Sequence, residues 1–166
     1  MTERHTLHAC YRGFVTQAVI INLTPLLFIV FQTDYAVTDE MLGRLILMNF
    51  GMQIFVDYFA VRVVDRIGYR MPLVFSHICS AVGLIFLALL PRILPVPYTG
   101  LLIAVGIYAV GGGLAEVVIS PVVESLSIGG GAANMSLLHS FYCWGQMVVV
   151  TISTLALRVI GTASRP

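Results

Sequence analysis

Five long apolar segments, separated by short polar stretches, constrain the fold of this chain more than any other feature of its sequence. About twenty residues of α-helix cross the hydrocarbon core of a bilayer, which is about 30 Å thick. Each segment is about that long, so the chain is predicted to be an all-α polytopic membrane protein with five transmembrane helices. The predicted helices cover approximately residues 13–33, 41–62, 72–90, 98–124 and 134–157.

The composition favours the same fold class. Hydrophobic residues make up 58% of the 166 residues and charged residues 10%, whereas a soluble domain carries about 25% charged residues. A chain of this length cannot bury so much apolar surface inside itself, so the excess is expected to face lipid. Residues 1–166 are therefore predicted to form a single transmembrane domain in the cell membrane.

The distribution of arginine predicts the orientation of the helices. All nine basic residues are arginine, and residues 1–12 together with the 62–70 loop contain five of them. The loop after the first helix carries Asp34, Asp39 and Glu40 instead. Because cytoplasmic loops are enriched in Lys and Arg, the N-terminus and the 62–70 loop are predicted to be cytoplasmic.

Several classes of function are disfavoured by what the sequence lacks. A net charge of +1 argues against a nucleic-acid partner. The three cysteines Cys10, Cys79 and Cys143 lie far apart without metal-ligand spacing, so we expect packing residues and neither a metal nor a cofactor. The chain has no nucleotide-binding loop, no H-E-x-x-H and no G-x-S-x-G, and we do not expect an enzyme.

Glu116 is the most conspicuous polar residue of the fourth segment. No charge lies between Tyr98 and Glu116, and the next charged residue is Glu124. A carboxylate at that depth costs about 2.5–3.5 kcal/mol to insert, so it usually faces a cavity or a partner. Glycines 111–113 allow a second helix to approach closely, and Pro121 removes a backbone donor. Glu116 is our first candidate for substrate binding or proton exchange; the alternative is a hydrogen-bonded packing residue.

Other polar side chains are expected to line a central cavity. Asn49, Gln53 and Asp57 recur every four residues, so they form one stripe that should point into the bundle. The alternative is that such groups only hold helices together, at about 0.6 kcal/mol per hydrogen bond in membranes. Asp57 is expected to pair with a nearby arginine. Four side chains are candidates for solute binding or proton coupling: Asn22, Asn49, Gln53 and His139.

The densest charge cluster lies between the second and third predicted helices, where residues 65–70 have the sequence D-R-I-G-Y-R. This loop resembles the G-x-x-x-D-R-x-G-R-R motif of the major facilitator superfamily, and its R-x-G-Y-R form is similar to the fucose-permease-like branch. Val61 replaces the first glycine and Tyr69 replaces a basic residue. The matching residues are Asp65, Arg66, Gly68 and Arg70.

Two further stretches resemble the same branch. In the fourth helix, small residues are followed by Glu116 and Pro121. The first helix departs from the branch, since sugar–proton members often carry an acid there and this chain has Asn22-Leu23-Thr24-Pro25. In the fifth helix, the branch's pattern of an Asn, a Leu, a His or Gln, an aromatic and a Gly is matched by Asn134, Leu138, His139, Tyr142 and Gly145.

The resemblance implies a fold of about twelve helices in two halves, with the substrate bound between them. With five helices, this chain is expected to be an incomplete, N-terminal fragment whose partner is the missing C-terminal half. The implied function is secondary active transport of a small polar solute by alternating access, with ion or proton coupling. A second hypothesis is a small accessory or structural membrane protein without transport activity of its own.

The resemblance also implies a role for the 62–70 loop. Asp65, Arg66, Gly68 and Arg70 would act as a conformational latch, in which Asp65 pairs with a helix of the second half in one transport state. The alternative is that the arginines of this loop only set the orientation of the chain in the membrane.

Overall fold

The computed structural model describes the backbone of residues 2–163 and, apart from Asp65, the side chains of residues 2–159. Within this range the chain is all-α, as predicted, and it forms no strand. The helices are α1 (Glu3–Leu26), α2 (Phe28–Tyr35), α3 (Asp39–Ile67), α4 (Arg70–Ile93), α5 (Pro97–Glu124) and α6 (Gly131–Ala163). Four of them are long and apolar enough to cross a membrane, and a fifth span is formed if α1 and α2 are counted together.

The first predicted span is broken. α1 and α2 meet at Leu27 and are bent by about 40°. Pro25, in the last turn of α1, has no N–H group, so the carbonyl of Ile21 loses its usual helical donor. The helix therefore changes direction here, next to the polar residues Asn22 and Thr24.

The helices are longer than the apolar segments that predicted them. The N-terminal polar stretch, expected to lie outside the first helix, is helical from Glu3 onwards. The predicted loop at Pro91 and Arg92 belongs to α4, which continues to Ile93. Pro97 starts α5 at a position where its missing N–H costs nothing. Hydrophobicity marks the lipid-embedded part of a helix, whereas backbone hydrogen bonds extend the helix into the polar interface.

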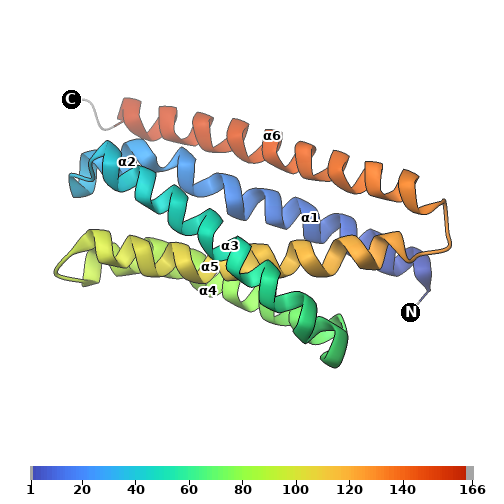
Figure 1. Cartoon of the computed structure of the whole chain (residues 1–166). Helices are drawn as coiled ribbons and strands as arrows, with labels where there is room; N and C mark the ends of the chain where they lie inside the picture. Colours follow the sequence, from blue (N-terminus) through green and yellow to red (C-terminus); the bar gives the residue numbers. More distant parts are fainter. Residues whose placement is uncertain (1, 164–166) are drawn as a thin grey trace.

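α5 is the central helix of the bundle. It packs against α4 along most of its length and also against α3, α1 and α6, while α6 covers α1. The N-terminus, the α3–α4 turn and the α5–α6 loop lie at one end, and α2 and the α4–α5 connection lie at the other (Figure 1). α1 and α3 diverge from each other towards the end that carries the N-terminus (Figure 1).

Close contact between α4 and α5 depends on glycine. A Cβ atom on Gly83 would lie 2.5 Å from the backbone nitrogen of Tyr108, and one on Gly111 would lie 2.6 Å from the carbonyl oxygen of Ser76. Neither position can hold a larger residue without moving the backbone of the neighbouring helix. The prediction that the glycines before Glu116 permit close helix packing is confirmed at Gly111.

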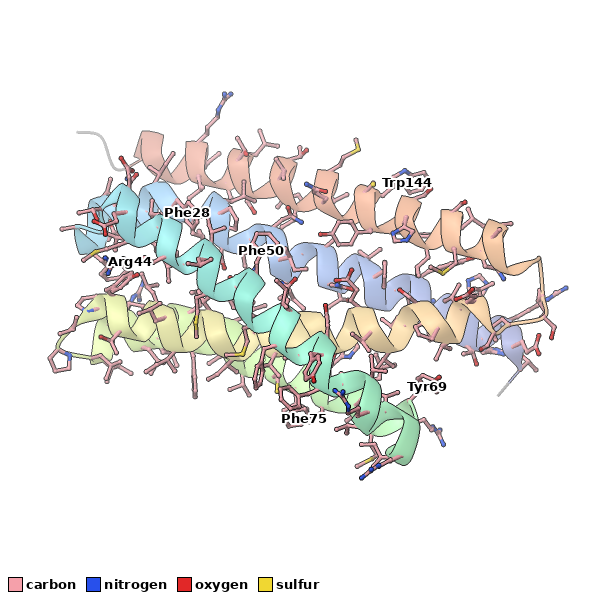
Figure 2. All side chains as sticks on the ribbon, viewed as in Figure 1. Phe28, Arg44, Phe50, Tyr69, Phe75 and Trp144 are labelled. Carbon is pink, nitrogen blue, oxygen red and sulfur yellow. The ribbon has the colours of Figure 1, made fainter. Side chains whose placement is uncertain are left out.

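Large apolar side chains cover the outside of the bundle. On α3 and α4 more than half of the surface of Phe50 and Phe75 is exposed, and Ile54 and Val74 are similarly exposed. Figure 2 shows Phe75 on the outer surface of the bundle. A soluble protein does not leave such a continuous apolar surface in water. The chain is therefore compatible with a multi-pass membrane protein, its outer surface facing lipid.

Candidate functional site

The centre of the candidate site is a hydrogen bond between α1 and α5. The side-chain Nε2 of Gln17 donates to the carboxylate Oε2 of Glu116 over 3.2 Å. Gln17 is only 2% exposed, whereas Glu116 is exposed. The carboxylate therefore has one fixed donor on the protein side and remains accessible on the other side.

Beyond this pair, residues of α1 continue to lie opposite residues of α5, because the two helices run antiparallel. One turn from Glu116, a Cβ atom on Gly112 would lie 3.7 Å from Ile21 of α1 and 3.9 Å from the amide nitrogen of Gln53 of α3. These are ordinary van der Waals distances, and they show that α1 and α3 both pack against α5 at this level. Gln53 is consequently close to the level of Glu116, as the proposed shared cavity requires.

A pocket of about 210 Å³ lies next, at the break between α1 and α2. Its polar wall consists of Asn22, Thr24, Asn49 and Tyr108, which come from three helices. The hydroxyl of Thr24 is buried and makes no hydrogen bond, although Tyr108 lies close enough to interact with it. Phe28 and Phe50 close the apolar side of the pocket (Figure 2).

The helix break lies in the wall of this pocket. Pro25 has no N–H group to donate to the Ile21 carbonyl, and Ile21 and Pro25 both line the pocket. Irregular helical backbone at membrane depth is tolerated where it lines a cavity. A small neutral molecule with hydroxyl or amide donors would find acceptors at the polar side chains of this pocket.

Asn22 connects the pocket with Glu116. Its Nδ2 donates to the carbonyl of Ala18 at 2.8 Å, so its side chain lies along α1 towards Gln17. Tyr142 of α6 reaches the same region, near Asn22 and Glu116. The structure thus brings Asn22 and Glu116, both predicted site residues, to one region of the molecule.

The stripe on α3 points into the bundle, as predicted. Asn49 is 7% exposed and its Oδ1 accepts a hydrogen bond from Gln53 at 3.3 Å. The expected pairing of Asp57 with an arginine is not formed among the described side chains, and the Oδ1 of Asp57 is buried without a hydrogen bond. α3 continues to Ile67, about three turns beyond Asp57, and Arg62 instead bonds the carbonyl of Tyr58 at 3.2 Å.

His139 and Trp144 of α6 lie away from this region. His139 is exposed and packs edge-on against Phe14, with 5.8 Å between the ring centroids. No described contact joins His139 to Gln17 or Glu116. Trp144 is 66% exposed and projects away from the other helices (Figure 2), so its side chain faces outwards and not into a cavity.

The predicted latch residues lie around the turn between α3 and α4. Gly68 ends α3 with φ 77° and ψ 172°, a conformation that is essentially restricted to glycine. Arg66 is in the last turn of α3, Arg70 starts α4, and both are exposed. The side chain of Asp65 lies outside the described residues. The backbone therefore explains the glycine of this motif without reference to a second half.

Packing accounts for several of the α6 residues that match the fifth-helix pattern of the branch. The side-chain amide of Asn134 donates to the carbonyl of Ile128 and thereby closes the loop after α5. Leu138 is fully buried against α1 and α5. A Cβ atom on Gly145 would lie 3.1 Å from both Ala18 and Val15, so this glycine allows α6 to approach α1.

Three residues of the site were not among the candidates chosen from the sequence: Gln17, Thr24 and Tyr108. The helical periodicity of the sequence could have identified these residues. Gln17 and Thr24 are seven residues apart and lie on one face of α1, and Tyr108, Gly112 and Glu116 recur every four residues on α5. The sequence does not show that this face of α1 packs against this face of α5.

Comparison of the chain with protein-family models, with curated proteins and with solved structures gave no match. Among the described residues, no three His, Cys, Asp or Glu side chains come together as metal ligands. Any function assigned to this chain therefore rests on its own residues: a carboxylate with one buried amide donor, and beside it a small pocket lined by amides and hydroxyls.

Proposed function

We propose that this chain is the N-terminal part of a secondary transporter that moves a small polar solute through the membrane by alternating access. It would belong to the major facilitator superfamily and be close to the fucose-permease-like branch. Support for the family comes from the motif at residues 65–70 and from the arrangement of glycines, Glu116 and Pro121 in α5. The twelve-helix fold of that family places the substrate at the interface of its halves.

The observation that carries the proposal is the bond between Gln17 and Glu116 beside the polar pocket at the α1–α2 break. Membrane interiors rarely contain a carboxylate, and where they do it usually serves a substrate or ion pathway. Here the carboxylate is held by a buried amide and is exposed on its other face. In the intact transporter that exposed face would be covered by the C-terminal half, and the solute would bind between the two.

The pocket indicates the chemistry of the solute. Its walls offer amide and hydroxyl groups and no charged side chain. A neutral, polyhydroxylated or amide-bearing molecule fits this set better than an ion does, because each of its hydroxyl groups can both donate and accept. Glu116 would accept hydroxyl donors when ionised, and it would exchange a proton if transport is coupled to protons.

Uptake of a panel of small neutral polar solutes, measured with Glu116→Gln and Glu124→Gln variants of the intact transporter that contains both halves, tests the proposal. Both variants remove one carboxylate from α5, but only Glu116 bonds Gln17. We expect Glu116→Gln to lose solute uptake or its pH dependence and Glu124→Gln to retain both. Equal behaviour of the two variants would contradict the role of Glu116. The absence of uptake even by the intact protein without substitutions would favour a structural or accessory membrane protein.

A further inference from the structure

A second groove, on a different side of α5 from the polar pocket, lies between α1 and α4. It has a volume of about 520 Å³ and is situated at the end of the bundle that carries the N-terminus. α5 forms its floor, while α1 and α4 form its two walls. The residues that matter for its chemistry are Thr6 and Ala9 on α1, Tyr69 and Arg70 on α4, and Val118 and Val122 on α5.

The inner part of this groove is apolar. Val118 and Val122 line its floor, and Ala9 and Val74 line its walls. Val74, Val118 and Val122 lie within helices that are long and apolar enough to cross a membrane, and Ala9 lies in α1, which forms such a span together with α2. A groove on this surface is in contact with the bilayer, so an acyl chain is the apolar molecule that is available to fill it.

The outer end of the groove is positively charged. Arg70 is exposed there, and among the described side chains the one ion pair joins Arg44 to Glu40 at the other end of the bundle. Arg70 therefore has no carboxylate partner in that set. It is also the first residue of α4, whose N-cap residue Tyr69 provides no side-chain cap to the free backbone N–H groups. A helix N-terminus without a cap carries a partial positive charge that favours an anion.

From these features we infer that the groove binds an anionic glycerophospholipid. Its phosphate interacts with the guanidinium of Arg70, with the N-terminus of α4 and with the hydroxyl groups of Tyr69 and Thr6. One acyl chain lies over Val118 and Val122. Basic pockets between transmembrane helices bind anionic headgroups in this way, and a negative lipid leaflet attracts the same residues. The inference needs only that the helices span a bilayer, and it is independent of any transport activity.

Native mass spectrometry of the purified chain, after equilibration with phosphatidylglycerol or with phosphatidylcholine, tests this inference. Arg70→Gln removes the charge at the mouth, and Ala9→Trp fills the groove from an exposed position on α1. We expect each variant to retain phosphatidylglycerol less well, Arg70→Gln by about fivefold, which corresponds to about 1 kcal/mol per arginine at a membrane surface. Retention of the zwitterionic lipid should be weak and unchanged.

Two matched variants serve as controls. Arg92→Gln removes an exposed arginine at the opposite end of α4, and Ala88→Trp adds the same indole at an exposed position outside the groove. Equal loss in Arg70→Gln and Arg92→Gln would overturn the inference. So would unchanged phosphatidylglycerol binding in Ala9→Trp, because it would mean that the acyl chain does not occupy the groove.

Discussion

Gln17 donates its side-chain amide to Glu116 across 3.2 Å, and this bond joins two helices whose residues stand 99 positions apart in the sequence. The two partners lie in different environments, since Gln17 is buried and Glu116 is exposed. A proton or a solute hydroxyl can therefore reach the carboxylate without displacing Gln17. The bond fixes the position of the acid while leaving its outer oxygen available.

This geometry predicts that Glu116→Gln and Glu116→Leu differ in stability. The glutamine still offers an acceptor to Gln17, whereas leucine leaves the buried Gln17 amide without one, which costs about 1–3 kcal/mol. We expect Glu116→Leu to unfold at a lower temperature than Glu116→Gln when both are purified in the same detergent. The corresponding changes at Glu124 should not differ in this way, because its side chain makes no described hydrogen bond. If leucine at position 116 were as stable as glutamine, the bond would contribute nothing.

The contact between α4 and α5 predicts that two similar glycine substitutions have opposite effects. In Gly83→Ala the new methyl group would lie 2.5 Å from the backbone of Tyr108, and such overpacking destabilises by about 1–3 kcal/mol. Gly51→Ala meets nothing within 4 Å and gains helix propensity, worth about 1 kcal/mol. Thermal unfolding of both variants checks this. A neutral Gly83→Ala would mean that the helices can separate at this point.

Much of the fold was predictable from the sequence because hydrophobicity determines where a membrane helix lies. The apolar segments and the inward face of Asn49 and Gln53 follow from apolar length and a four-residue period. The structure has four such spans, or five if α1 and α2 are counted together, and it buries Asn49. Pro25 was the only feature of the sequence that suggested the break at Leu27. The size of the bend could not be predicted, because it depends on how the neighbouring helices pack and not on the proline alone.

The candidate site was predictable only in part, because it depends on contacts between distant segments. Glu116 was selected for its position in an apolar helix, but nothing in the sequence assigns Gln17 as its partner. The prediction that Asp57 pairs with an arginine was wrong for a related reason. A prediction of helix ends from hydrophobicity placed Asp57 near the cytoplasmic end, whereas α3 continues to Ile67.

The turn between α3 and α4 predicts a purely conformational effect at Gly68. Its φ of 77° and ψ of 172° are strained for any residue with a Cβ atom, and a substitution costs about 1–3 kcal/mol. Nothing lies within 4 Å of the position that the Cβ would occupy, so no clash adds to this strain. We expect Gly68→Ala to lower the unfolding temperature and Gly43→Ala, in an open helical position, to leave it unchanged or raised. Identical effects would mean that the turn adapts without strain.

The polar pocket predicts that Thr24→Val stabilises the chain in the absence of solute. The Thr24 hydroxyl is buried without a hydrogen bond, and an unpaired buried hydroxyl costs about 1–3 kcal/mol. Valine has nearly the same shape and removes this group. As a control, Thr16→Val replaces an exposed hydroxyl that bonds the carbonyl of Arg12, and it should change stability by less than about 0.5 kcal/mol. Destabilisation by Thr24→Val would show that the hydroxyl has a partner, such as the neighbouring Tyr108.

The distribution of arginine predicts which ends of the helices face the cytoplasm. Labelling of single cysteines tests it in a variant without Cys10, Cys79 and Cys143. We place one cysteine at Ser127, in the α5–α6 loop, and another at Val96, before α5, since both positions are exposed and lie at opposite ends of the bundle. A membrane-impermeant maleimide added to intact cells should label Val96→Cys at once and Ser127→Cys only after the membrane is opened. The reverse pattern would place the N-terminus and the 62–70 loop outside, and labelling of both positions in intact cells would mean that the arginines do not fix a single orientation.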